Sequence, residues 1–237
     1  MGETFVRPGV PVEPPAGAFA RAPRAAPEMS APLFAAPSGP LLPAAERARR
    51  LELLRQETLR CRVCRLCRER AQVVFGEGHA DAELMLVGEG PGAEEDRQGM
   101  PFVGAAGQLL TKIIQAIELD RSQVYITNVV KCRPPGNRDP EHDEIDACLP
   151  HLLEQIELVR PRLIVALGRV AARTLLHSAA PMTQLRGAWY KVRGADLRVT
   201  YHPAALLRDE LLKRPTWDDM KIVRDRLKEL REQGPKG

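Results

Sequence analysis

The chain has 237 residues, a formal net charge of +4 and 44% hydrophobic residues. This length leaves room for one well-formed hydrophobic core and hardly for two. No stretch approaches the ~20 apolar residues of a membrane-spanning helix, and no basic start followed by an apolar segment marks a secretory signal. We therefore expect a single globular domain in the reducing cytoplasm, where clustered cysteines bind metal more often than they form disulfides.

The first 43 residues differ in composition from the rest of the chain. They hold ten of its 21 prolines, interleaved with alanine and few charges. Proline lacks a backbone donor and fixes φ, so helices and sheets do not form over such a segment. We expect a disordered tail over residues 1–43, followed by one folded domain over residues 44–233.

Helical and strand patterns alternate from Ala44 onward. The first helix carries Leu51, Leu54 and Thr58 on one side and ends at a cysteine cluster. We expect strands over 83–88, 123–131 and 162–168, followed by the segments AWYKV and LRVTY as a hairpin or as an edge strand beside a fourth core strand. Further helices are expected over 107–119, 139–159 with a kink at Pro150, 169–177, and near the C-terminus, the last over 216–232. This order is typical of a three-layer α/β/α sandwich around a mostly parallel four-stranded sheet.

Polar residues follow several of these strands. Glu89 follows the first strand, Asn128 lies near the end of the second, and His202 follows the segment LRVTY. In open parallel sheets, ligands bind outside the carboxyl ends of the strands. We therefore expect an acid, an amide and an imidazole to meet at one edge of the sheet and form the active site.

The loop after the first strand reads VGEGPGAEEDRQGMPFVG and combines five glycines with four carboxylates, those of Glu89, Glu94, Glu95 and Asp96. It lacks the lysine and hydroxyl of a phosphate-binding loop, and a proline interrupts the dinucleotide-binding pattern. Two interpretations stay open. The carboxylates hold Mg²⁺ for nuclease chemistry, or a carboxylate acts without metal by positioning water or stabilising a developing cation.

The five cysteines favour a metal site. Cys61 and Cys64 have the Cys-x-x-Cys spacing, and Cys132 and Cys148 can supply a second pair. Spacing alone allows several iron sites or zinc. The surrounding region over 47–70 is rich in arginine, which indicates either a nucleic-acid partner or a solvated basic face.

Three motifs occur in order along the chain: GEGPGAEEDRQGMPFVGAAGQLL, YITNVVKCRPPGNRDP and YHPAALLR, with CRVC ahead of them. Jointly they resemble the family 4 uracil-DNA glycosylases, the iron–sulfur type, from about Leu51 to Leu230. The resemblance implies a monomeric DNA repair enzyme that flips uracil out of single- or double-stranded DNA and hydrolyses its N-glycosidic bond, leaving an abasic site. It also makes the tail a candidate contact for a sliding clamp or another repair protein.

The resemblance implies roles for individual residues. Phe102 would stack on uracil, Asn128 would pair with its O4 and N3–H, Glu89 would hold the attacking water, and His202 would hydrogen-bond O2 of the departing base. Each has a plainer alternative: a core phenylalanine, a strand-end amide, an exposed loop acid and a structural histidine.

Further residues complete the implied site. Gly90 would leave backbone access to the base, Glu95 would wall off the C5 side of the ring, and Asp96 would support the site. A [4Fe–4S] cluster would be held by Cys61, Cys64, Cys132 and Cys148, with Cys67 a free thiol. Two other functions stay open, a metal-dependent nuclease using the acidic loop and a non-catalytic iron–sulfur DNA-binding module.

Overall fold

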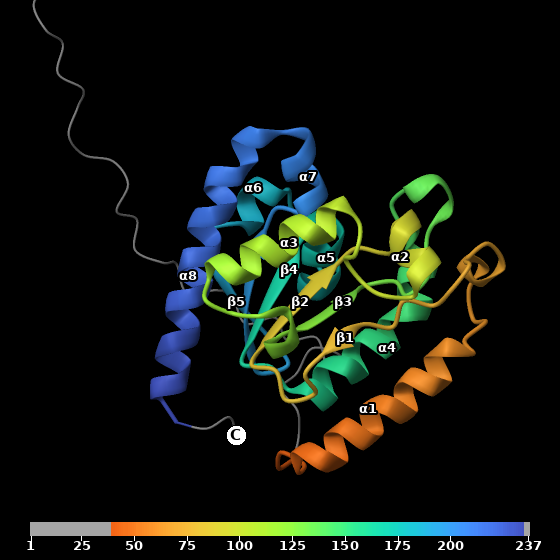
Figure 1. Ribbon diagram of the computed structural model, residues 1–237, viewed down its shortest axis with the longest axis horizontal. Helices are drawn as coiled ribbons and strands as arrows, with labels where there is room; N and C mark the ends of the chain where they lie inside the picture. The colour runs from red at the N-terminus through yellow and green to blue at the C-terminus, as the bar shows by residue number, and fades with distance from the viewer. Residues whose placement is uncertain (1–38, 235–237) are drawn as a thin grey trace, which may run out of the picture.

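The computed structural model describes residues 39–234 (Figure 1). The tail expected over residues 1–43, and the partner contact suggested for it, therefore lie outside the described residues apart from 39–43. Helix α1 (Ala44–Leu59) begins directly after Pro43. No helix within residues 39–234 is long and apolar enough to cross a membrane.

A six-stranded sheet forms the middle of the domain, in the order β1-β3-β2-β4-β6-β5. Its strands are β1 (Glu77–Gly78), β2 (Leu84–Gly88), β3 (Tyr125–Asn128), β4 (Leu163–Leu167), β5 (Trp189–Val192) and β6 (Ala195–Thr200). The four central strands β3, β2, β4 and β6 run parallel, as predicted. The antiparallel strands β1 and β5 extend the sheet at its two edges. Strand β1 was not predicted because two residues carry no readable periodicity.

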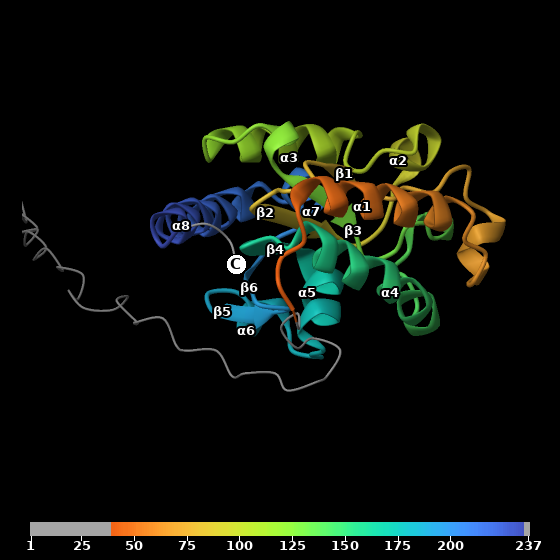
Figure 2. The same cartoon turned by 90° about the horizontal axis from the view of Figure 1, so that it is seen from below.

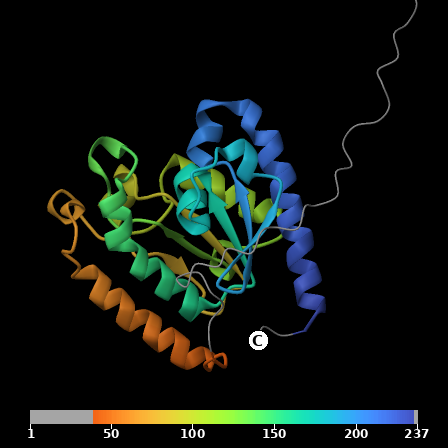
Figure 3. The same cartoon turned by 180° about the vertical axis from the view of Figure 1, so that it is seen from behind.

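Helices cover both faces of the sheet, which confirms the three-layer prediction (Figures 1 and 2). Besides α1 they are α2 (Ala93–Gln98), α3 (Ala105–Ala116), α4 (His142–Val159), α5 (Gly168–Leu176), α6 (Met182–Leu185), α7 (Pro203–Arg208) and α8 (Lys213–Glu232). Helices α3 and α8 pack on one face, and α4 and α5 pack on the other. Helix α1 lies against the outer side of α4, as the view from behind also shows (Figure 3).

The strand sequences explain why both faces are covered. Along β2, Leu84 and Leu86 join the core under α3 and α8, whereas Met85 and Val87 join the core under α4 and α5. Successive side chains of a strand point to opposite faces. A strand that is apolar at every position therefore needs a helix layer on each side.

One helix was not predicted from the sequence, and one predicted helix begins later than expected. Helix α2 lies inside the glycine-rich loop, where no helix was expected, and Glu94, Glu95 and Asp96 all fall in its first turn. Carboxylates are favourable there because they face the positive end of the helix dipole. Helix α4 begins at His142 after Glu141, which forms a capping box with Glu144, and it continues through Pro150. The start predicted near Asp139 was wrong because Asp139 belongs to the preceding loop.

Candidate active site

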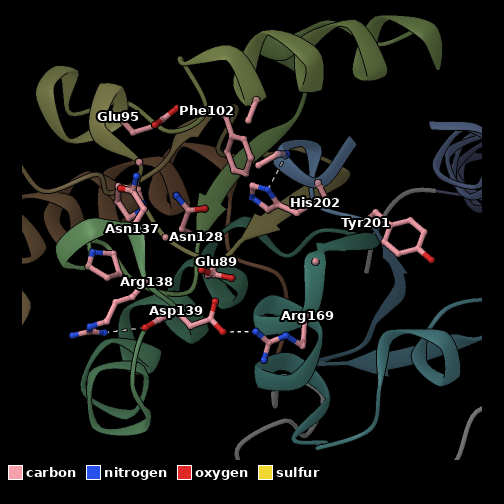
Figure 4. Close-up of a pocket in the computed structure, with 18 of the residues that line it drawn as sticks. Glu89, Glu95, Phe102, Asn128, Asn137, Arg138, Asp139, Arg169, Tyr201 and His202 are labelled. Atoms are coloured by element: carbon pink, nitrogen blue, oxygen red, sulfur yellow. Dashed lines mark hydrogen bonds and ion pairs between the residues drawn. The ribbon is translucent and has the colours of Figure 1, made fainter. Parts of the chain in front are cut away.

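A cavity of about 510 Å³ opens at the carboxyl ends of the parallel strands (Figure 4). This volume suits a small-molecule ligand or one nucleotide base. Its walls come from the segments after β2, β3, β4 and β6. Six of the residues singled out from the sequence line it: Glu89, Gly90, Glu95, Phe102, Asn128 and His202.

Asn128 stands on the floor of the cavity at the end of β3 and is 1% exposed. Its side-chain Oδ1 is buried and has no hydrogen-bond partner among the described residues. A buried acceptor left unpaired is unfavourable by about 1–3 kcal/mol, so such an atom at a cavity floor indicates a place for a ligand donor. Gly88 makes room for this amide, because a Cβ there would lie 2.3 Å from Oδ1.

Phe102 forms the upper wall of the cavity with its ring (Figure 4). Its backbone has φ +52°, in the left-handed region that bulky residues rarely adopt. The turn is possible because Gly107 packs against it, where a Cβ would lie 1.9 Å from the Phe102 carbonyl oxygen. Strain of this kind concentrates at binding sites, and here it aims an aromatic face into the cavity.

Glu95 and Asp96 have different positions. Glu95 lines the cavity, and its Oε1 accepts hydrogen bonds from the backbone N–H groups of Val103 and Gly104, each at 2.9 Å. It thereby fixes the turn that carries Phe102. Asp96 is buried away from the cavity and accepts from the N–H groups of Ala71 and Gln72. The structure therefore does not bring Asp96 to the site.

Glu89 follows β2 and lies on the side of the cavity opposite Phe102 (Figure 4). Burial and, to a smaller extent, the nearby Asp139 raise the pKa of its carboxyl to about 7, against the opposing effect of Arg169 and Arg208. No hydrogen bond or ion pair joins the Glu89 carboxylate to any side chain within residues 39–234. A carboxylate that titrates near neutral pH and is not engaged elsewhere is suited to exchange a proton with water.

His202 is the N-cap of α7, and its Nδ1 accepts a hydrogen bond from the N–H of Ala204 at 3.2 Å. Burial lowers the pKa of the imidazole to about 4, so the ring is neutral at neutral pH. With Nδ1 accepting, the single ring proton sits on Nε2, which makes that atom a donor. The ring centroids of His202 and Phe102 lie 5.5 Å apart. Gly168, at φ +88°, leaves room for His202, because a Cβ there would lie 2.9 Å from the His202 Cβ.

The structure adds cavity residues that sequence reasoning missed: Asn137, Asp139, Arg169, Tyr201 and Arg208. Asp139 and Arg169 form an ion pair along the wall near Glu89 (Figure 4). A signal existed for Arg169, since it directly follows Gly168 at the carboxyl end of β4. Asn137 and Asp139 fall within the motif YITNVVKCRPPGNRDP, but no strand or helix pattern placed them at the cavity, because they belong to an irregular loop.

The five cysteines gather in a second place. All of them line one small cavity between the segment 61–67, the residues after β3, and α4. Arg70 donates to the Cys132 sulfur at 2.9 Å, and the backbone N–H of Lys131 donates to the Cys148 sulfur at 3.3 Å. Burial raises the pKa of Cys132 to about 11 and shifts those of Cys64 and Cys148 upward. Within residues 39–234, no three His, Cys, Asp or Glu side chains are arranged to hold a single metal ion.

Comparisons with known proteins match most of this domain to the family that the sequence motifs resemble. Residues 75–221 match the model of the uracil DNA glycosylase superfamily. The type-4 uracil-DNA glycosylase of Sulfurisphaera tokodaii is 46% identical over 184 residues, 74% of this chain and 84% of the relative. Those of Pyrobaculum aerophilum and Thermotoga maritima are 45% and 41% identical, over 69% and 75% of this chain and 87% and 95% of the relatives. The chain therefore belongs to the uracil DNA glycosylase superfamily, within its type-4 group.

Proposed function

We propose that this protein is a DNA repair glycosylase that takes a uracil nucleotide into the cavity and hydrolyses its N-glycosidic bond, leaving an abasic site. The observation that carries the proposal is the unpaired Oδ1 of Asn128 on the cavity floor. Uracil presents the N3–H donor that this acceptor lacks. Its neighbouring O4 can accept from the amide Nδ2 of the same side chain.

The same amide explains the choice of base. Cytosine carries an acceptor at N3 and an amino donor at C4, so an amide held in this orientation meets both with the wrong partner. A site with buried polar groups rejects a mismatched ligand strongly because the groups are left unpaired. Phe102 supplies the face on which the flipped base stacks, and Gly90 and Glu95 complete the wall around it.

The chemistry follows from the two groups on either side of the base. The glycosidic bond breaks with its electron pair leaving on uracil, and the Nε2–H of His202 stabilises the negative charge that gathers on O2. Glu89 orients a water whose oxygen bonds to the sugar C1′ and whose proton passes to the carboxylate. The ionised carboxylate also faces the positive charge that develops on the deoxyribose.

We further propose that Cys61, Cys64, Cys132 and Cys148 hold a [4Fe–4S] cluster. The donor set supports this, because thiols line a common cavity and N–H groups donate to two of the sulfurs. Such clusters are ligated by four cysteine thiolates, and hydrogen bonds to sulfur are usual around them. The cluster would tie the segment 61–67 to the residues after β3 and to α4, and Cys67 would stay a free thiol.

One experiment tests the activity. The protein is incubated with an oligonucleotide that carries a single uracil, in excess EDTA, and the product is analysed on a gel with and without alkali. We expect an intact strand that alkali cleaves only at the uracil, and no cleavage of a matched thymine oligonucleotide. Strand cleavage without alkali, or loss of all activity in EDTA, would instead indicate the nuclease.

The positions of the loop acids disfavour that nuclease alternative. Glu94 pairs with Arg97, Glu95 caps the Phe102 turn, and Asp96 is buried elsewhere. The non-catalytic binding module is tested by Glu89→Gln and Asn128→Ala. Both variants should lose base release, whereas a binding module would have no base release to lose. We propose the cytoplasm as the compartment, where DNA and reduced thiols occur together.

A further inference from the structure

We propose that Asp139 is a positioning residue that holds the Arg169 guanidinium beside Glu89 and away from the Glu89 carboxylate oxygens during uracil release. The inference rests on the proposed function. It assigns a function to two residues for which the sequence predicted no role in the site.

The pair lies on the cavity wall next to Glu89. Asp139 comes from the loop before α4, and Arg169 comes from the first turn of α5. Their side chains join through Oδ2 and Nη2, and both line the cavity into which Glu89 points (Figure 4). The charged groups around this cavity are Glu95 on α2, Arg138 and Asp139 before α4, Arg169 on α5, and His202 and Arg208 at α7.

Asp139 is held in place from its own loop. Its carbonyl oxygen accepts from Arg138 Nη1 at 2.9 Å, and Arg138 in turn donates to Glu144 at 2.7 and 2.8 Å. Glu144 is fully buried. A buried carboxylate held by several donors is a fixed point, so the Asp139 carboxylate is presented to Arg169 from a rigid support.

This arrangement solves a conflict at Glu89. The carboxylate must be charged to orient water and to face the developing cation, but burial favours its neutral form. An arginine nearby favours the charged form. An arginine bound directly to Glu89 would occupy the oxygens that the water needs. By engaging Arg169, Asp139 keeps the guanidinium near Glu89 and leaves the Glu89 oxygens open.

The two partners act on Glu89 with opposite sign, which makes the proposal testable. Asp139 raises the pKa of Glu89, and Arg169 lowers it. Single-turnover rates of uracil release are measured against pH for Asp139→Asn and Arg169→Met, with enzyme in excess over the oligonucleotide. We expect the acidic limb of the profile to move to lower pH in Asp139→Asn and to higher pH in Arg169→Met, each by about 0.5 unit or more.

Both substitutions break the same ion pair, so a purely structural clasp would give the same effect in each. Limbs that move in the same direction, or that do not move, would overturn the proposal. Arg169→Lys keeps the charge and should restore the original limb. Arg173→Met is the matched control, since it removes an arginine from the same helix outside the cavity and should leave the limb unchanged.

Folding does not obscure the result. The side chains of Arg169 and Asp139 are 49% and 53% exposed, and an exposed pair contributes little to stability. Melting temperatures of all variants check this directly. If the proposed function is wrong, the unsubstituted protein releases no uracil at any pH. If only this inference is wrong, the unsubstituted protein stays active and the acidic limb does not shift in the variants as expected.

Discussion

Glu89 and His202 face the same cavity, and burial shifts both toward their neutral forms. The consequence differs because one is an acid and the other a base. Across neutral pH the carboxyl changes its charge, since its pKa is about 7, whereas the imidazole stays neutral, since its pKa is about 4. Of these two groups, therefore, only the Glu89 carboxyl titrates near neutral pH.

The rate of uracil release should follow that titration. The charged form of Glu89 is the active one, so the rate should rise with pH through about 7 and fall about tenfold per unit well below it. Glu89→Gln should lose a factor of about 10²–10⁴ and lose this pH dependence. Single-turnover kinetics across the neutral range measure both. A rate that stays level down to about pH 5 would contradict the assignment.

A second prediction for a single residue concerns Gly88, which leaves space for the side chains of the cavity. A Cβ at this position would lie 2.3 Å from Oδ1 of Asn128 and 2.5 Å from Cζ of Phe102. Gly88→Ala should therefore displace the base-pairing amide and the stacking ring together, and uracil release should fall by at least about a hundredfold while the fold persists. Gly187→Ala is the control for steric contact, because no atom lies within 4 Å of its added Cβ; unlike Gly88, Gly187 has a positive φ, so its stability is measured alongside. Equal rates for the two variants would refute this account of the cavity.

At the scale of elements, the apolar strands were predictable and the loop conformations were not. Every residue of β2 and β4 is buried, so these segments are recognisable as central strands from composition alone. Helix α2 was missed because glycine, proline and acid dominate its surroundings, and its stability depends on contacts of Glu95 and Asp96 with distant backbone N–H groups. Such contacts exist only once the chain has folded.

Helix α8 is joined to β6 by a buried carboxylate that the sequence did not reveal. Asp219 is 4% exposed and accepts from Thr200 at 2.7 Å, from Arg186 at 2.8 and 2.9 Å, and from Arg198 at 3.3 Å. Thr200 ends β6, two residues before His202. The contact therefore fixes the strand end that presents the imidazole.

Removing this carboxylate should destabilise the protein strongly. Asp219→Ala leaves the buried Arg198 and the partly buried Arg186 without their counter-charge, and we expect a loss of about 3–5 kcal/mol in the free energy of unfolding. The neighbouring Asp218 is the matched control, because its side chain is 54% exposed and pairs with Lys221 on the surface. Asp218→Ala should cost about 1 kcal/mol or less. Denaturant unfolding curves compare the two, and similar midpoints would speak against the role of Asp219.

On the scale of the whole molecule, the site joins residues that are far apart in sequence. Glu89, Asn128 and His202 could be predicted to converge because the ends of parallel strands share one edge of a sheet. Asp139 and Arg169 could not, because their meeting depends on how the loop before α4 folds back over α5. The sequence predicted that two pairs of cysteines, Cys61 with Cys64 and Cys132 with Cys148, come together at one site. It did not predict that Cys67 lines the same cavity.

The cysteine cavity is mechanically connected to the active site. Arg65, between two of the cysteines, donates to the buried Glu144 at 2.8 Å, and Glu144 also accepts from Arg138 beside the active-site cavity. Cys132 lies four residues after Asn128 in the chain and accepts from Arg70. Loosening the cysteine segment should therefore loosen both the loop before α4 and the end of β3.

Cys132→Ala tests this connection. The variant should lose the brown colour and visible absorbance of an iron–sulfur cluster, fold in lower yield, and melt at a lower temperature, because four ligands are needed and the cluster joins segments that are far apart in the chain. Cys67→Ala is the control and should keep its colour, since Cys67 is the thiol outside the proposed ligand set. Absorbance, iron content and melting temperature are measured on both before uracil release is compared. A colourless Cys132→Ala protein with unchanged stability and activity would show that the active-site segments hold their positions without the cysteine cavity.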